Sequence, residues 1–522
     1  MAAATLYLVA ALLAASASAG AAAAAGSGVA DDGDEARYTL PEGFLFGAGV
    51  SAVQTEGAWN TSGKKESAAD RLLHTPIFTT QGSHDVAADS YHRYAEDVNM
   101  AKQLKLKVFR FSISWARLLP DTDSKNPNKE GVAYYHALLD KIIEANMIPM
   151  VTLYHFDHPQ SLQDEFFGWE DNRMVAKFVE YADFVFNEFG KKVKYWTTLN
   201  EPNQYCMYFN MLFVLGGVLK PEQVDIHRCM HHTTLAHMKA YRLYKTKYFT
   251  EQQGQVGYTA LLVHAQPKTT SVQDVYAADA FNQMHCGKIL HPVVFGDYPE
   301  SIKRLLPDLP AFTDEEKKDL KDSTDFLGLN IYNGIIASYD PNAGANRPQV
   351  PIYSQLLEKL PFLDVGNPAD LVLFDKITPE VMERSVLWTW QQYGVPIAIT
   401  ENGYSGTDDR KRAVYLSSYM RSLIGAVHDY GVKVIAYCTW SLIDSFEWSG
   451  GYSRPFGLVH VDYENGTLNR SLKPHSLKFF TELADKNVIP FVAPTPSSAP
   501  TLSRGAALTL VLGVLINVLT IH

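Results

Sequence analysis

Two glutamates, Glu201 and Glu401, each follow an apolar run of residues that is typical of a strand buried on both faces. Each stands beside an asparagine, in "KYWTTLNE" and in "VPIAITENG". Two facing carboxylates can cleave a glycosidic bond, because one donates a proton to the leaving oxygen while the other attacks the sugar or activates water. A single glutamate at the end of a strand is more often a loop cap or part of a surface ion pair. The hypothesis therefore depends on elements that bring the two glutamates together.

The runs that end in these glutamates belong to a series of eight. Helical patterns lie between the runs; in residues 131–146, the apolar side chains Tyr135, Leu138, Leu139, Ile142 and Ile143 recur at the helical period. Repeated strand–helix alternation predicts an α/β fold, a single (β/α)8 TIM barrel with long active-face loops. The alternative is an open doubly wound sheet, but the glycines of the first run do not form the usual phosphate turn after an early strand. The eight runs are 44–51, 107–115, 147–155, 194–201, 255–265, 325–333, 395–403 and 432–442.

In such a barrel the carboxyl ends of the strands form the active face. Glu201 and Glu401 end the fourth and seventh runs, which lie three places apart in a ring of eight, so their side chains should face each other across the mouth. Polar or aromatic residues also occupy the other strand ends, where a purely structural barrel would need only aliphatic ones. Taken singly, each has a structural explanation, but their joint placement favours a binding site. They are Gln54, Arg110, His155, Asn200, Asn330, Tyr332, Trp440, Glu447 and Trp448.

Several motifs resemble those of glycoside hydrolase family 1, the β-glucosidase family. "TLNEP" and "ITENG" resemble its acid/base and nucleophile motifs, and the resemblance covers residues 38–485. Further similar segments are "FLFGAGVSAVQTEGAWN", "FRFSISWARLLP", "TLYHFDHPQSLQ", "DFLGLNIY" and "WSLIDSFEWSGGY". The resemblance, to a secreted animal-type member, implies a retaining β-glycosidase. Such an enzyme hydrolyses O-linked β-glucosides, and also β-galactosides or β-fucosides, without a metal or organic cofactor.

The resemblance also assigns roles to matching positions. Glu201 would be the general acid/base and Glu401 the nucleophile. An adjacent arginine favours the ionised nucleophile, and that anion in turn should raise the pKa of Glu201. The remaining roles implied are Asn200 at the sugar 2-hydroxyl, Gln54 and His155 near the 3-hydroxyl, Glu447 and Trp448 at the 4- and 6-hydroxyls, Trp440 as the sugar platform, Arg110 and Tyr332 at the nucleophile, and Asn330 as support for that network.

The chain departs from the family pattern around the expected aglycone side. Phe156 and Lys288 replace residues that are usually tryptophan, and we expect Lys288 to be a solvated surface lysine. The segments 207–223 and 373–388 lack the usual landmarks. These departures leave the preference for an aglycone open. Family members that act on 6-phosphoglycosides replace the glutamate at this position so that the phosphate is not repelled. The presence of Glu447 therefore argues against a 6-phosphoglycoside substrate.

Three other functions share parts of this site. A glycosidase-like sugar-binding or receptor protein that has lost catalysis usually lacks one of the two carboxylates, and both are present here. A transglycosylase uses the same covalent intermediate with an acceptor other than water. Plant thioglucosidases replace the acid/base glutamate by glutamine, so Glu201 argues against that variety without excluding thioglycosides.

The resemblance implies that the substrate is a small β-glycoside or oligosaccharide. The 522 residues are 46% hydrophobic with a formal net charge of −11, and no block rich in lysine and arginine indicates a nucleic-acid partner. An apolar start that ends in Ala17-Ser18-Ala19 predicts a signal peptide over residues 1–19. A flexible segment (20–37), the barrel (38–488), a Pro/Ser linker (489–505) and a hydrophobic tail (506–522) follow.

The tail carries a membrane hypothesis. It is shorter than the roughly 20 apolar residues of a spanning helix and is not followed by basic residues. A GPI-attachment signal fits better, with an anchor helix and a plain tail as alternatives. We therefore expect an extracellular or cell-surface protein that is tethered through its tail. The sequence does not indicate the oligomeric state.

Four cysteines and three sequons complete the features of a secreted chain. Cys206 and Cys229 flank one expected loop and could pair, whereas Cys438 lies in an apolar strand and should be a buried thiol. No CxxC or His/Cys cluster has the short spacing of metal ligands, so no metal is expected. The triplets that begin at Asn60, Asn465 and Asn469 are candidate N-glycosylation sites.

Overall fold

The computed structural model describes residues 35–79, 82–346, 354–366 and 376–494. The expected signal peptide, most of the flexible segment, most of the linker and the hydrophobic tail lie outside the described residues. The chain divides into a compact unit, Met1–Val492, and a second unit, Ala493–His522, of which only the first two residues are described. Within the described part, no helix has both the length and the apolar character needed to span a membrane.

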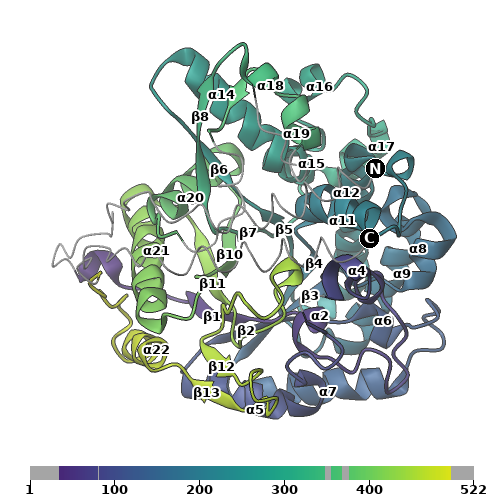
Figure 1. Ribbon diagram of the computed structural model, residues 1–522, viewed down its shortest axis with the longest axis vertical. Helices are drawn as coiled ribbons and strands as arrows, with labels where there is room; N and C mark the ends of the chain where they lie inside the picture. Colours follow the sequence, from purple (N-terminus) through teal and green to yellow (C-terminus); the bar gives the residue numbers. More distant parts are fainter. Residues whose placement is uncertain (1–34, 80–81, 347–353, 367–375, 495–522) are drawn as a thin grey trace, which may run out of the picture. The chain divides into compact units, whose positions relative to one another are not determined.

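Eight parallel strands close into a barrel, which confirms the (β/α)8 prediction and excludes the open sheet (Figure 1). The strands neighbour one another in chain order, and the ring closes where Leu45 to Gly49 pair with Ala436 to Trp440. Their side chains are almost all buried, as expected for strands covered by helices on the outside and packed inside the barrel. The strands are β1 (Leu45–Gly49), β2 (Val108–Ser112), β3 (Ile148–Tyr154), β4 (Tyr195–Asn200), β5 (Gln255–Leu261), β7 (Phe326–Asn330), β10 (Ile397–Asn402) and β11 (Val434–Trp440).

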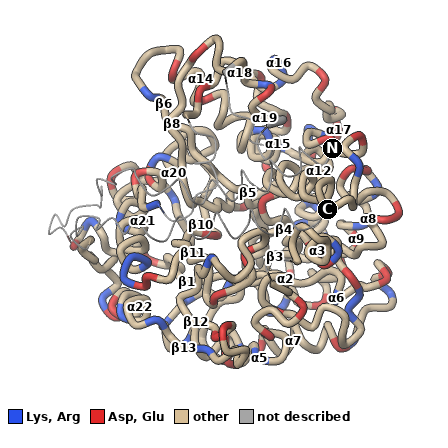
Figure 2. Tube along the Cα trace, in the orientation of Figure 1, with Lys and Arg blue, Asp and Glu red and all other residues tan. Residues whose placement is uncertain are grey.

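Amphipathic helices surround the barrel. In the helix over Lys129–Glu144, the expected apolar stripe is buried at Tyr135, Leu138, Leu139 and Ile142. Ile143 was expected on the same stripe but is exposed, because it lies at the edge of the stripe. Charged residues of both signs occupy these outer helices and their loops, while the central strands carry few (Figure 2). The principal helices are α5 (Ser90–Gln103), α7 (Lys129–Glu144), α9 (Arg173–Phe189), α12 (Ile226–Leu243), α15 (Lys288–Phe295), α20 (Glu380–Tyr393), α21 (Asp409–Tyr430) and α22 (Pro474–Lys486).

The active-face loops contain further elements. The stretch that follows β7 begins with a strand, β8, which pairs with β6 and β9 in a small separate sheet. Only part of this long connection is therefore irregular. The remaining strands are β6 (His264–Pro267), β8 (Gly334–Tyr339), β9 (Leu363–Asp364), β12 (Val459–Val461) and β13 (Arg470–Leu472). The other α-helices are α2 (Ala52–Thr55), α3 (Ala68–Leu73), α4 (Pro76–Thr79), α6 (Trp115–Leu118), α8 (Gln160–Phe166), α10 (Pro202–Gln204), α11 (Asn210–Leu215), α13 (Phe249–Gln252), α14 (Val272–Asn282), α16 (Glu300–Leu305), α17 (Asp314–Leu320), α18 (Ala343–Asn346) and α19 (Ser354–Glu358).

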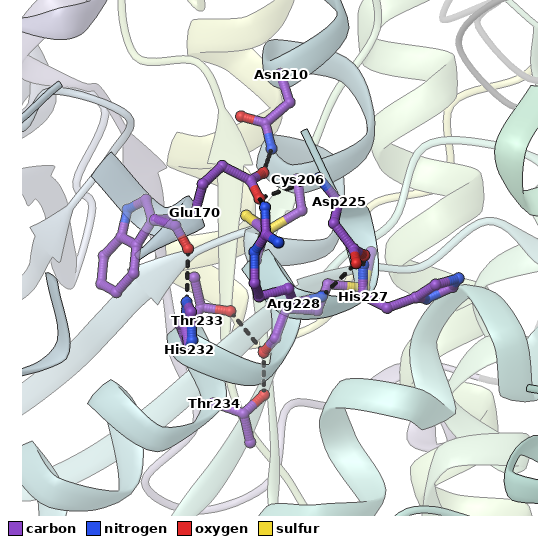
Figure 3. Close-up of a disulfide and its surroundings, with 12 residues drawn as sticks. Glu170, Cys206, Asn210, Asp225, His227, Arg228, His232, Thr233 and Thr234 are labelled. Carbon is purple, nitrogen blue, oxygen red and sulfur yellow. Dashed lines mark hydrogen bonds and ion pairs between the residues drawn. A yellow bond between two sulfur atoms is a disulfide. The ribbon is translucent and has the colours of Figure 1, made fainter. Parts of the chain in front are cut away.

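The cysteines behave as the sequence suggests. Cys206 and Cys229 form a disulfide between the segment after β4 and helix α12 (Figure 3). Cys438 is a buried thiol, and so is Cys286. The three sequon asparagines are exposed, which is compatible with glycan attachment.

Two expectations need correction. Lys288, expected at the surface, is only 1% exposed on α15, and its Nζ lies 2.9 Å from His227 Nδ1. Burial lowers the pKa of this lysine to about 7, because a charged ammonium loses its hydration inside the protein. The compact unit also continues beyond residue 488. Ile489 is buried, and Ser417 on α21 donates to the carbonyl of Pro490, so the start of the expected linker belongs to the folded domain.

Candidate active site

The carboxylate of Glu401 lies at the centre of a buried hydrogen-bond network. Arg110 on β2 donates through Nη1 to Glu401 Oε1 at 2.6 Å, and Tyr332, just after β7, donates to Glu401 Oε2 at 2.8 Å. Both donors favour the anion, and the guanidinium also compensates its charge. The pKa of Tyr332 is held well above its usual range, first by burial and then by the charge of Glu401, so this phenol keeps its proton and remains a donor.

Glu201 has a different environment, although it belongs to the same network. It is buried and accepts one hydrogen bond, from Asn330 Nδ2 at 2.7 Å. Burial and the nearby charge of Glu401 raise its pKa, and the bond from Asn330 only partly offsets them. One carboxyl group is therefore held protonated beside another that is stabilised as an anion. Cleavage of a single bond by an acid and a nucleophile requires one protonated and one ionised carboxyl group.

The backbone at the end of β4 aims the Glu201 side chain. Glu201 has a left-handed conformation, with φ 43°, and its N–H donates to the carbonyl of Thr259 on β5. A non-glycine residue in this region costs about 1–2 kcal/mol, so the barrel holds it there against a local preference. Pro202 then begins the short helix α10, with its fixed φ suited to the first helical position.

Asn200 and Asn330 fix the orientation of the network. Asn200 Oδ1 accepts from Arg110 Nη2 at 2.8 Å and from Asn330 Nδ2 at 3.1 Å. Thr400 Oγ1 donates to Asn330 Oδ1 at 2.6 Å, which turns the Asn330 amide nitrogen toward Glu201. Thr400 lies inside the "ITENG" motif, but no signal in the sequence marks it as a residue of the site.

The tautomer of His155 follows from these contacts. Because the Asn200 oxygen is already occupied by two donors, its Nδ2 faces His155 Nε2 at 3.3 Å, and Nε2 must accept. Burial and the Arg110 charge lower the pKa of His155 well below its usual value, so the ring is neutral and carries its proton on Nδ1. Within the described protein, Nδ1 is buried and has no hydrogen-bond partner.

The opposite wall combines an acid with aromatic rings. Glu447 Oε1 accepts from Trp440 Nε1 at 3.2 Å and from Ser445 Oγ at 2.8 Å. Burial raises the pKa of Glu447 to about 8. The Trp440 ring stacks at 17° to His155, with centroids 6.0 Å apart, which gives one side of the cavity a flat apolar surface.

These side chains surround a cavity with an empty volume of about 980 Å³. Most of the predicted site residues line it, whereas Arg110 and Asn330 lie behind its wall and hold the carboxylates. The predicted lining residues are Gln54, His155, Asn200, Glu201, Tyr332, Glu401, Trp440, Glu447 and Trp448. Lining residues absent from the sequence prediction are Phe156, Gln204, Tyr208, Phe209, Leu261, Ser449, Arg454 and Phe456. Three of these occur just after Glu201, in or beside the segment that departs from the family pattern.

That segment is held from behind by the disulfide and by Glu170 (Figure 3). Glu170 accepts from Asn210 Nδ2 at 2.7 Å and from Arg228 Nη2 at 2.8 Å, linking α11 to α12 beside Cys206–Cys229. On the cavity side, Tyr208 donates to Ser449 Oγ at 2.9 Å. The outer part of the cavity therefore has a braced wall.

Comparison with known proteins agrees with this geometry. The family model described as glycosyl hydrolase family 1 matches residues 36–489. The chain belongs to glycosyl hydrolase family 1. Among its relatives, Beta-glucosidase 42 of Arabidopsis thaliana is 38% identical over 453 residues, covering 82% of this chain and 91% of that protein. Myrosinase 1 of Brevicoryne brassicae is 36% identical over 472 residues, covering 87% and 98%.

Solved structures of the family have the same fold. A rice β-glucosidase mutant in a covalent complex with Glc matches with a TM-score of 0.78 at 30% identity, covering 85% of this chain and 99% of that one. Aphid myrosinase matches with a TM-score of 0.77 at 33% identity, covering 86% and 99%. This family 1 protein is thus a retaining β-glycosidase that hydrolyses O-linked glycosides and takes a small-molecule glycoside as its substrate.

Proposed function

We propose that Glu401 is the nucleophile and Glu201 the acid/base of a β-glucosidase that also accepts β-galactosides or β-fucosides. The observation that carries this assignment is the contrast between the two carboxyl groups. Glu401 receives hydrogen bonds from Arg110 and Tyr332, whereas burial and the Glu401 charge raise the pKa of Glu201.

In the first step the Glu401 carboxylate attacks the anomeric carbon while Glu201 donates its proton to the glycosidic oxygen. The carbon–oxygen bond breaks, the aglycone alcohol leaves, and the sugar is held as an ester of Glu401. The ester carries no negative charge, so the pKa of Glu201 falls and its carboxylate can act as a base. Glu201 then takes a proton from water, whose oxygen attacks the anomeric carbon and releases Glu401. Two inversions give overall retention.

The sugar would be oriented by groups whose donor and acceptor capacity is unused or adaptable. We assign Asn200 to the 2-hydroxyl, Gln54 and His155 to the 3-hydroxyl region, and Glu447 with Trp448 to the 4- and 6-hydroxyls. Trp440 would be the platform under the ring. This assignment is supported by the position of these side chains on the cavity wall.

The outer cavity favours an aromatic or otherwise apolar aglycone. Phe156 and Phe209 lie in ring contact there, with centroids 4.4 Å apart, and Phe209 also contacts Trp448 of the sugar-binding wall, with centroids 4.7 Å apart. Such rings contribute a large apolar surface of fixed shape. Water and a second sugar or alcohol compete as acceptors for the same ester, so transglycosylation is the second reaction that this site could support.

Two measurements test the proposed function. The first is an NMR assay of the anomer released from an aryl β-glucoside, which should be the β-anomer before mutarotation. The second uses a 2-deoxy-2-fluoroglucoside, which should label Glu401 and place its mass on the peptide that contains "ITENG". Initial release of the α-anomer, or a label on another residue, would overturn the mechanism. Added alcohol acceptors would separate hydrolysis from transfer by the products that form.

We further propose that the protein is secreted, N-glycosylated and tethered through its C-terminal tail to the extracellular surface of the cell membrane. The apolar start, the exposed sequons at Asn60, Asn465 and Asn469 and the terminal apolar run support this. Release from intact cells by a phosphatidylinositol-specific phospholipase would support a GPI anchor. Retention on the membrane after that treatment would favour an anchor helix, and free secretion would exclude a tether.

A further inference from the structure

We propose that His74, His84 and Asp85 form a binding site for one divalent transition-metal ion of the zinc type, outside the sugar cavity. His74 directly follows α3, and the other two residues lie in the loop that leads to α5. One ligand atom from each residue, an imidazole nitrogen or a carboxylate oxygen, lies within 4.8 Å of the other two. The residues are ten and eleven positions apart in sequence, so a search for short ligand motifs does not find them.

The distances among these atoms fit a small ion. His74 Nε2 lies 2.8 Å from Asp85 Oδ1, and His84 Nδ1 lies 3.9 Å from the same oxygen. Ligands that each lie about 2.0–2.2 Å from a tetrahedral zinc ion are roughly 3.3–3.5 Å from one another. These two separations lie on either side of this value, and every pair of ligand atoms lies within 4.8 Å, so the three side chains must adjust their positions around a bound ion. Two imidazoles and one carboxylate form a ligand set that suits zinc and its neighbours in the first transition row.

Asp70 orients His84 for this purpose. The Asp70 Oδ1 atom lies 3.0 Å from His84 Nε2 in a buried contact. The other Asp70 oxygen, Oδ2, accepts from Lys64 Nζ and from the N–H and hydroxyl of Ser67, so Asp70 acts as an acceptor throughout its contacts. His84 therefore donates through Nε2 to Asp70, and its other ring nitrogen, Nδ1, lies 3.9 Å from Asp85 Oδ1. A carboxylate behind a histidine is the usual outer partner of a metal-binding imidazole.

The site can be reached from solvent. His84 is buried, whereas the side chains of His74 and Asp85 are 31% and 43% exposed, so the ion can enter from solvent. The Lys64 ammonium is bound to Asp70 on the opposite oxygen from His84, and its charge is compensated there. The Asp85 carboxylate supplies negative charge at the site, and water can complete the coordination.

The ion would brace one wall of the sugar cavity. The His84 ring packs against Phe446, with centroids 6.0 Å apart. Phe446 exchanges two hydrogen bonds with Gln54 and directly precedes Glu447. Ser83, next to His84, accepts a hydrogen bond from Tyr452 at 2.8 Å. A metal that joins α3 to this loop would therefore stabilise the fold and tighten the wall that carries Gln54, without touching the reacting atoms.

The test uses the complete chain after removal of metal with a chelator. Isothermal titration with Zn²⁺ should show one saturable site of micromolar or tighter affinity, and melting should shift to higher temperature as the site fills. Co²⁺ should give the visible absorption of a four-coordinate nitrogen–oxygen site. His84→Gln and Asp85→Asn should each weaken binding by about tenfold to a hundredfold or more. His92→Gln, at an exposed histidine that pairs with Asp89, is the matched control and should leave binding unchanged.

Each outcome decides the proposal. Asp85 is partly exposed, so Asp85→Asn should fold even if the buried His84 variant does not. Saturable binding that Asp85→Asn weakens, with the control unaffected, supports the site. No saturable binding by the wild-type chain, or binding that both His84→Gln and Asp85→Asn leave intact, would overturn it.

Discussion

Arg110 and Glu401 join β2 to β10 through a charged hydrogen bond of 2.6 Å beneath the cavity. The same guanidinium donates to Asn200, the residue before Glu201, so one planar group positions both halves of the carboxylate pair. Both arginine and glutamate are almost inaccessible to water. In such a setting the removal of one partner leaves an uncompensated charge, whereas the intact pair is a rigid electrostatic support.

Arg110→Lys should therefore lower the activity strongly, although the substitution keeps the positive charge. Lysine has one point-like ammonium and cannot donate in a fixed fork to both Glu401 and Asn200. We expect kcat/KM for an aryl β-glucoside to fall about 10²–10³-fold, the usual effect of losing a preorganised donor. Arg71→Lys is the control, because Arg71 also forms a forked pair with Glu66, but near the surface. Comparable losses in the two variants would refute the positioning role.

Glu201→Gln should separate substrates by the basicity of their leaving groups. A proton donor matters most when the departing alcohol is a poor leaving group, and general acids contribute about 10²–10⁴-fold. Alkyl glucosides should lose that factor in kcat/KM, whereas a dinitrophenyl glucoside should change little. An equal loss for both substrates would show that Glu201 is not the acid.

The pH profile provides a second measure of Glu201. Because burial and Glu401 raise its pKa, the wild-type enzyme should retain the acid form above the usual glutamate range. Activity should then fall on the alkaline side as Glu201 loses its proton. In Glu201→Gln this limb should vanish from the profile of the residual kcat/KM for an alkyl glucoside, a substrate that needs the acid. A limb that persists unchanged belongs to another group.

The sequence predicted the barrel and the residues near the carboxylates because both depend on local signals. Strands buried on both faces read as apolar runs, and the polar residue that ends each run marks the active face. Thr400 and Ser445, by contrast, act only through the side chains that they orient, Asn330 and Glu447. Nothing in the sequence around Thr400 or Ser445 identifies these partners. The contact of His84 with Asp70 likewise depends on how a loop folds back onto α3.

Lys288 shows the limit of such reasoning most clearly. A lysine in an unfamiliar segment is most often solvated, yet here it lies behind α12 against His227. Its burial depends on the packing of two helices that are distant in sequence. The burial of its ammonium group lowers the stability of the wild-type protein.

Lys288→Met should stabilise the protein, and the gain should depend on pH. Below about pH 7 the folded chain must bury the ammonium, while the unfolded lysine keeps its proton up to roughly pH 10.4. Wild-type stability should therefore rise with pH between these values. The advantage of methionine, about 1–4 kcal/mol at low pH, should shrink toward pH 10. Denaturant unfolding at several pH values measures it, with Lys239→Met on the exposed face of α12 as control. A gain independent of pH would contradict the buried charge.

The disulfide should stabilise the folded protein and also support the wall of the outer cavity that Tyr208 and Phe209 form, here called the aglycone wall. Cys206 lies two residues before Tyr208, and the bridge to Cys229 spans 23 residues. The double variant Cys206→Ala/Cys229→Ala should lose about 3 kcal/mol in the free energy of unfolding, as expected for a loop of this length. KM for aryl glucosides should rise several-fold because the segment with Tyr208 and Phe209 is less constrained, while kcat changes little because Glu201 is held by β4 and Asn330. Reductant should reproduce these effects in the wild-type enzyme and leave the double variant unchanged. A fall in kcat at constant KM would place the bridge in support of Glu201 instead of the aglycone wall.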